Sequence, residues 1–282
     1  MSENTKIEWA HHTVNLWTGC TKVHSGCDNC YAESWAKRWG NNIWGNNPRN
    51  EVKGAWDLLA RLQKNAQRDG EIQRVFINSL SDIFEKTMPL IDSKGKLIEN
   101  IFTGNLRSQF FNQIDFGRYE NLMFLLLTKR PSNINKIIPP YWIDNPPKNV
   151  IFGTSPCDQE TADILIPQLL KVNGKKFLSI EPQLGHINLT ALNEFKNTEI
   201  NCLTGDTTHS TSEGVGAISR GNKIDWVIQG GESGHGKRPF NLDWAHSIRE
   251  QCKNANIPYF FKQIDKVQDI PEEMLVREFP NI

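Results

Sequence analysis

Short, continuously apolar runs alternate along this chain with segments of helical periodicity. The apolar runs lie at 75–79, 123–128, 150–155, 177–182, 226–231 and 259–263, with a further candidate at 13–17. Each run is too short for a helix, and unbroken apolarity is typical of strands buried on both faces. Helical spacing occurs at 32–39, 54–67, 161–172 and 242–255. The alternation predicts parallel βαβ units and therefore an α/β fold, a full or partial TIM-like (β/α) barrel.

One segment interrupts this alternation. Residues 196–223 are rich in Thr, Ser, Gly and Asn. Such a composition favours loops over buried elements, so we interpret 196–223 as a mobile surface insertion. The rest of 1–282 is expected to form a single barrel domain, because one barrel commonly takes about 250 residues.

Composition narrows the class of protein. Hydrophobic residues make up 38% and charged residues 23% of the 282 positions, as in a globular chain, and the formal net charge is zero. The balance lacks the basic excess of a general nucleic-acid binder. We see no apolar signal segment and no run long enough to span a membrane, so we expect a cytoplasmic protein. Thiols stay reduced in that compartment.

Charged residues follow several of the predicted strands directly. They are Asp82, Lys129, Glu181, Glu232 and Lys262. In parallel α/β folds the active site lies beyond the C-terminal strand ends, so these side chains are candidates to hold a cofactor and a substrate. The simpler alternative is that polar residues stand there because strand ends meet water.

Three of the six cysteines fall within one stretch, WTGCTKVHSGCDNCYAE (17–33). Cys20, Cys27 and Cys30 have the spacing Cys-x6-Cys-x2-Cys, which in a reducing compartment favours metal binding over disulfides. One alternative is a zinc site closed by a fourth ligand such as His24. The other is a [4Fe–4S] cluster held by three thiolates, with one iron open to a further ligand.

Several motifs together resemble a known family. In order, they are the cysteine stretch, FINSLSDIFE (76–85), LLLTKRP (125–131), SIEPQLG (179–185), GGESGHGKRPF (230–240) and PYFFKQ (258–263). They are similar to the three-Cys-motif phage protein family, a domain of unknown function common in bacteriophages and prophages. The resemblance extends from 17 to 263.

A more distant likeness concerns the radical S-adenosylmethionine enzymes of the spore photoproduct lyase branch. The order of cysteine loop, NSLSD and LLLTKR is similar to theirs, although their usual loop is Cys-x3-Cys-x2-Cys. The resemblance implies that Ser79, Asp82, Thr128 and Lys129 face S-adenosylmethionine. It also implies that Cys157 returns a hydrogen atom to a product radical, whereas the simpler interpretation is that Cys157 fills a gap in the core.

The resulting hypothesis is an iron–sulfur enzyme of the radical S-adenosylmethionine type, with Glu181, Lys262 and Cys157 at the reacting centre. It would need an electron donor. Phage context and the lyase likeness suggest a nucleic-acid base or nucleotide as substrate. The alternative hypothesis is a non-catalytic, zinc-bound accessory protein that serves a partner protein of a phage or defence locus.

A last candidate feature is aromatic and basic. It comprises Trp35, Trp39, Trp44, Lys37, Arg38 and Arg49. These side chains could stack on bases and contact phosphates. The simpler alternative is an amphipathic helix that packs its tryptophans into the core.

Overall fold

The computed structural model describes residues 2–38, 40–195, 197–211, 214–234 and 236–281. The chain divides into two compact units. The first comprises Met1–Val23 and Cys30–Ile151, and the second comprises His24–Asn29 and Phe152–Ile282. The cysteine stretch therefore contributes to both units, with Cys27 in the second and the other two cysteines in the first.

The first unit contains three strands of a parallel sheet and a four-stranded mixed sheet. The parallel strands lie in the order β1 (His12–Val14), β4 (Gln73–Ile77) and β7 (Leu122–Thr128). The mixed sheet has the order β2 (Trp17–Thr18), β3 (Arg49–Glu51), β5 (Pro89–Ile91) and β6 (Leu97–Phe102). The helices are α1 (Tyr31–Arg38), α2 (Ala55–Asp69), α3 (Thr103–Asp115) and α4 (Ile134–Ile137), with 3₁₀ turns at Pro131–Asn133 and Pro140–Trp142.

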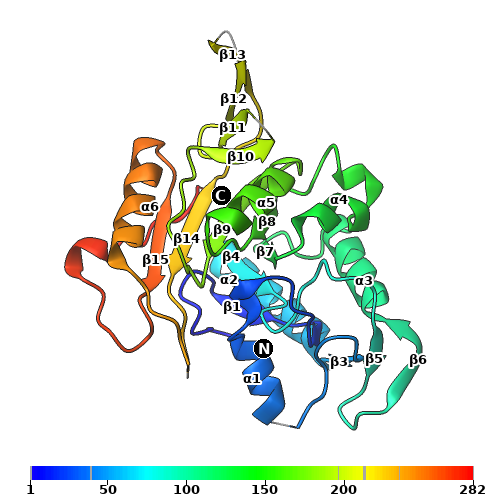
Figure 1. Cartoon of the computed structure of the whole chain (residues 1–282). Helices are drawn as coiled ribbons and strands as arrows, with labels where there is room; N and C mark the ends of the chain where they lie inside the picture. The colour runs from blue at the N-terminus through cyan, green and yellow to red at the C-terminus, as the bar shows by residue number, and fades with distance from the viewer. Residues whose placement is uncertain (1, 39, 196, 212–213, 235, 282) are drawn as a thin grey trace. The chain divides into compact units, whose positions relative to one another are not determined.

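The second unit repeats the parallel arrangement and adds a separate antiparallel sheet (Figure 1). Its parallel strands are β9 (Lys175–Ile180), β14 (Trp226–Gly230) and β15 (Tyr259–Gln263). The antiparallel strands are β10 (Leu192–Phe195), β11 (Thr198–Asn201), β12 (Asp206–Thr211) and β13 (Gly214–Arg220). The helices are α5 (Gln159–Leu170) and α6 (Leu242–Asn254), with 3₁₀ turns at Ser25–Cys27 and Glu272–Met274.

The predicted α/β class is confirmed, because parallel strands alternate with helices in both units. Strand β8 (Val150–Thr154) begins in the first unit and ends in the second. The apolar runs form strands because their residues are buried at successive positions, as in β14, where all five residues are buried. A full barrel is not shown by the described residues.

The segment 196–223, interpreted from sequence as an insertion, carries most of the antiparallel sheet. Strands β11, β12 and β13 pair in sequence with registers such as Glu199↔Thr208 and Thr207↔Ser219. Threonine favours strands because its β-branched side chain suits a pleated surface, so a Thr-rich stretch divided by glycines can form hairpins. Residues 196, 212 and 213 lie outside the described part of the chain.

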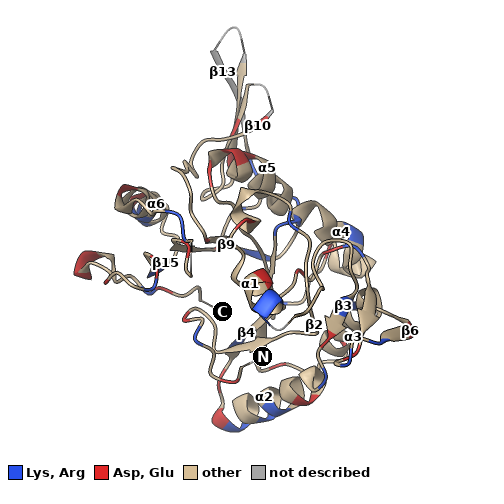
Figure 2. Ribbon diagram, turned by 60° about the horizontal axis from the view of Figure 1, so that its bottom comes forward, with Lys and Arg blue, Asp and Glu red and all other residues tan. Residues whose placement is uncertain are grey.

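Charge is interspersed over the helices. Figure 2 shows both acidic and basic residues on α2, which carries Asp57 and Asp69 near its two ends and Arg61, Lys64 and Arg68 between them. The helix thus presents both signs, in agreement with the zero net charge of the chain. In the described residues, no helix combines the length and the apolar character that a membrane crossing requires.

Candidate functional site

The C-terminal ends of β4 and β7 meet at the carboxylate of Asp82. Its Oδ1 accepts a hydrogen bond from the Thr128 hydroxyl at 2.8 Å, and its Oδ2 accepts one from the Lys129 backbone N–H at 3.2 Å. Arg130 donates from Nη1 to the same Oδ2 at 2.7 Å, and Phe84 N–H donates to Oδ1. The structure therefore brings together Asp82, Thr128 and Lys129, three of the predicted site residues, and Asp82 is only 5% exposed.

Ser79 lies at the start of the same turn. Asn78, just before it, has a left-handed backbone with φ of 60°, and its Oδ1 accepts from the Leu16 N–H at 2.9 Å. The Ser79 hydroxyl accepts from Asn15 Nδ2 at 3.2 Å, and its carbonyl accepts from the Tyr31 hydroxyl at 2.6 Å. The turn after β4 is thus attached to both the segment before Cys20 and the helix after Cys30.

Arg130 links this turn to the first cysteine. Its Nη1 lies 3.9 Å from Cys20 Sγ, and its Nη2 donates to the Thr21 carbonyl. Burial raises the pKa of the Cys20 thiol to about 12, and the charges of Asp82 and Glu85 act in the same direction. The Arg130 guanidinium opposes them, so it is the group that favours a thiolate at Cys20.

A buried ion pair lies beside Cys20. Arg49 is fully buried and donates from Nε and Nη2 to Glu85 at 2.9 and 2.6 Å. The same guanidinium donates to the Thr21 hydroxyl at 2.9 Å and to the backbone carbonyls of Ile43, Gly45 and Asn47. Arg49 therefore ties the start of the cysteine stretch to the 43–47 loop.

The segment His24–Asn29 is bound by the GGESGHGKRPF turn within the second unit. Glu232 accepts from Asn29 Nδ2 at 2.9 Å and from Arg238 Nη2 at 2.6 Å. Arg238 also donates from Nη1 and Nη2 to the Ser25 carbonyl, each at 3.1 Å. Burial would raise the pKa of Glu232, but the hydrogen bonds from Arg238 and Asn29 outweigh it and hold the pKa below its usual value.

Cys157 is buried beside the same segment, with 1% of its surface exposed. Its Sγ lies 3.5 Å from the Ser25 hydroxyl and 3.8 Å from His24 Nδ1. The Thr161 hydroxyl donates to Sγ at 3.6 Å, and Asp158, the N-cap of α5, lies at the same distance. Burial raises the pKa of the Cys157 thiol, so this sulfur is held as a thiol rather than a thiolate.

The ends of β9 and β15 also come together. Glu181 Oε1 accepts from Lys262 Nζ and, at 3.3 Å, from Gln263 Nε2. Gln263 Nε2 also donates to the Gly231 carbonyl at 3.0 Å. The structure thus joins Glu181 and Lys262, which the sequence placed at the ends of separate strands.

All six cysteines are free thiols. Cys20, Cys27 and Cys30 are partly exposed, whereas Cys157 and the two remaining cysteines, at 202 and 252, are buried. Over the described residues, no group of three or more His, Cys, Asp or Glu side chains is arranged to hold a metal ion. Of the six cysteines, the three in the predicted cluster motif are the residues that are not buried.

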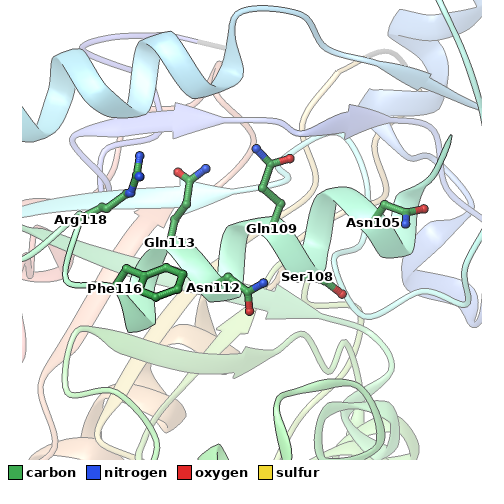
Figure 3. Close-up of a pocket in the computed structure, with 7 residues that line it drawn as sticks. All are labelled: Asn105, Ser108, Gln109, Asn112, Gln113, Phe116 and Arg118. Carbon is green, nitrogen blue, oxygen red and sulfur yellow. The ribbon is translucent and has the colours of Figure 1, made fainter.

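A hollow of about 510 Å³ lies on the first unit, along α3 (Figure 3). Its lining is polar apart from one phenylalanine and consists of Asn105, Ser108, Gln109, Asn112, Gln113, Phe116 and Arg118. Phe116 is 80% exposed. None of the residues predicted to form the site lies in this hollow.

Sequence reasoning missed the arginines that organise these clusters. Arg130 lies in the LLLTKRP motif and Arg238 in the GGESGHGKRPF motif. They could have been found from the rule that a buried carboxylate needs a cationic or hydrogen-bonding partner. The prediction that Arg49 contacts phosphate is wrong, because its guanidinium is buried against Glu85. Trp35 is 39% exposed, and Trp39 lies outside the described residues.

Comparison with known proteins gives a family and no biochemistry. A family model described as a protein of unknown function, DUF5131, matches residues 4–274. No curated protein and no solved structure matches this chain. The match covers nearly the whole sequence, from before the cysteine stretch to beyond the last parallel strand. The chain therefore belongs to the DUF5131 family, a domain of unknown function.

Proposed function

We propose that this protein is an iron–sulfur enzyme of the radical S-adenosylmethionine type, in which Cys20, Cys27 and Cys30 bind a [4Fe–4S] cluster. The observation that carries the proposal is the triplet itself, three free and partly exposed thiols within one short stretch. Cysteine thiolates are the usual ligands of such clusters, so the donor set fits. Three ligands leave one iron available to a small molecule.

A bound cluster together with S-adenosylmethionine supplies one-electron cleavage and radical chemistry, while the protein supplies binding and orientation. Arg130, 3.9 Å from Cys20 Sγ, stabilises negative charge on that sulfur. Asp82 holds the guanidinium in place through a 2.7 Å ion pair. Of these two side chains only Arg130 opposes the burial that disfavours a thiolate at Cys20, because the Asp82 charge acts in the same direction as burial.

The strand-end residues divide into two groups in this proposal. Ser79, Thr128 and Lys129 contact S-adenosylmethionine, with Asp82 orienting the last two through the hydrogen bonds described above. Glu181 and Lys262 position the substrate as a charge-assisted pair. The partial TIM-like barrel belongs to the same proposal.

Cys157 is proposed as a hydrogen-atom donor. Its support is that the sulfur is buried, carries a raised pKa and lies within reach of Ser25 and Thr161 hydroxyls. A protonated thiol is the form that a hydrogen-atom donor requires. The phage association and a nucleic-acid base or nucleotide as substrate rest on the family and lyase likenesses alone.

The proposal is tested by metal analysis of protein purified without oxygen. We expect a brown protein that contains about four iron and about four sulfide ions per chain. After reduction with dithionite, added S-adenosylmethionine should yield 5′-deoxyadenosine. A colourless protein with one zinc per chain, and no nucleoside product, would instead support the zinc-bound accessory protein.

A further inference from the structure

The carboxylate of Glu232 accepts nearly as many hydrogen bonds as it can, all from donors in its own chain. Oε2 accepts from Asn29 Nδ2 at 2.9 Å, from the Arg238 backbone N–H at 2.8 Å and from Arg238 Nε at 3.0 Å. Oε1 accepts from Arg238 Nη2 at 2.6 Å. A carboxylate offers about four lone-pair positions, so these four donors occupy most of its capacity. The side chain is 5% exposed.

The same arrangement grips the cysteine stretch on both sides of Cys27. On the N-terminal side, the Ser25 carbonyl accepts both Nη1 and Nη2 of Arg238 at 3.1 Å. On the C-terminal side, Asn29 donates to Glu232 and to the Gly236 carbonyl, each at 2.9 Å. Arg238 Nη1 also lies 3.5 Å from the Asp28 carboxylate.

The turn that carries Glu232 is itself anchored. A Cβ at Gly231 would lie 2.0 Å from the Ile264 carbonyl and 2.9 Å from Phe240 Cβ, so only glycine allows this approach. The Gly231 N–H donates to the Gln263 carbonyl at 3.0 Å, and Lys237 pairs with Asp265 at 2.7 Å. The grip on 24–29 is therefore exerted from a fixed turn at the end of β14.

We propose that Glu232 and Arg238 are positioning residues that hold segment 24–29 so that the Cys27 thiol is presented for metal binding. This inference rests on the proposed function in one respect only, that Cys27 is a metal ligand. Arg238 is the link, because its planar guanidinium binds the Glu232 carboxylate and the Ser25 carbonyl at once. Lysine cannot reproduce that geometry, since its ammonium is a point charge.

The test measures alkylation of Cys27 in the full-length, metal-free protein. Wild type and the Arg238→Ala, Arg238→Lys and Glu232→Gln variants are treated with limiting iodoacetamide, and each cysteine is quantified by peptide mass spectrometry. We expect Cys27 to react about tenfold faster in all three variants, because loss of a charge-assisted contact eases local opening. Arg220→Ala, which removes an exposed ion pair with Asp206 in the same unit, is the matched control.

The buried thiols at 202 and 252 report on folding in the same samples. If the thiols at 202 and 252 become reactive in Arg238→Ala, that variant has lost its fold. The Cys27 alkylation rate of the milder variant, Arg238→Lys, is then compared with wild type instead. Rates for Cys27 within twofold of wild type in the folded variants would overturn the proposal.

Iron uptake separates this inference from the proposed function. A wild-type protein that takes up no iron, with Cys27 still released in the variants, would refute the cluster and would show that Glu232 and Arg238 hold segment 24–29 without serving a cluster. Normal iron uptake in every variant, with Cys27 reactivity unchanged, would refute the positioning role and leave the cluster in place. Reduced iron uptake by the variants, together with faster alkylation, is the result we expect.

Discussion

Replacing Glu85 by glutamine should be one of the most destabilising isosteric changes in the first unit. Glu85 accepts two hydrogen bonds from Arg49, at 2.9 and 2.6 Å, and both side chains are almost completely buried. Glutamine keeps the shape but removes the charge, and its NH₂ group would face the guanidinium. Arg49 is then a buried cation whose strongest partner has been lost.

The size of the effect follows from the burial. Breaking a buried ion pair on one side costs about 3–5 kcal/mol, because the remaining charge is left uncompensated. Hydrogen bonds to charged groups are worth about 1.5–3 kcal/mol each, so two of them give about 3–6 kcal/mol, which overlaps that range. The carbonyls around Arg49 still accept its other protons, which places the expected loss near the lower end, about 3 kcal/mol.

Calorimetry of metal-free protein gives the measurement. At about 2–4 °C per kcal/mol for a chain of this size, a 3 kcal/mol loss lowers Tm by about 6 °C or more. Glu3→Gln is the matched control, since Glu3 pairs with Arg61 at 3.2 Å on the surface of the same unit and should contribute less than about 1 kcal/mol. Equal shifts in the two variants would refute the reasoning.

Two further predictions concern the metal and the pH dependence of stability. Cys27→Ala should abolish the visible absorption of reconstituted protein. The control Cys202→Ala, at a fully buried position, should retain that absorption. Full colour in Cys27→Ala would contradict the cluster. Burial lowers the pKa of Lys176 to about 8, below its unfolded value near 10.5, so the unfolded chain binds more protons between these pH values and stability should rise across them. Lys176→Met should therefore flatten that rise and stabilise the protein at pH 7 by up to about 3 kcal/mol, measured by urea unfolding; an unchanged pH profile would contradict this assignment.

The strands could be predicted because a strand that is buried on both faces appears in the sequence as an unbroken apolar run. The run 259–263 coincides with β15, and 226–231 differs from β14 by one residue. The same logic predicted that polar residues would gather beyond the strand ends. Asp82 indeed accepts from the Lys129 backbone N–H, and Glu181 accepts from Lys262, although each pair is separated by tens of residues in sequence.

Helix α3 and the β5–β6 hairpin escaped prediction for opposite reasons. The sequence of α3, TGNLRSQFFNQID, has amides on one face and two adjacent phenylalanines, Phe110 and Phe111, so its apolar periodicity is weak. Strand β6 exposes Leu97, Ile101 and Phe102, so it lacks the alternation of a half-buried strand. Helix α3 is stabilised by packing of Phe110 and Phe111 in the core, whereas β6 is stabilised by its pairing with β5.

The role of a strand-end carboxylate could not be predicted, because it depends on how many donors the fold directs at it. Asp82 and Glu232 each accept from four donors, so each carboxylate serves to join segments of the protein to one another. Glu181 differs, because both of its side-chain hydrogen bonds among the described residues end on Oε1. A carboxylate can accept about four hydrogen bonds, so Glu181 retains capacity for a ligand. Of these three acids, Glu181 is therefore the strongest candidate for direct substrate contact.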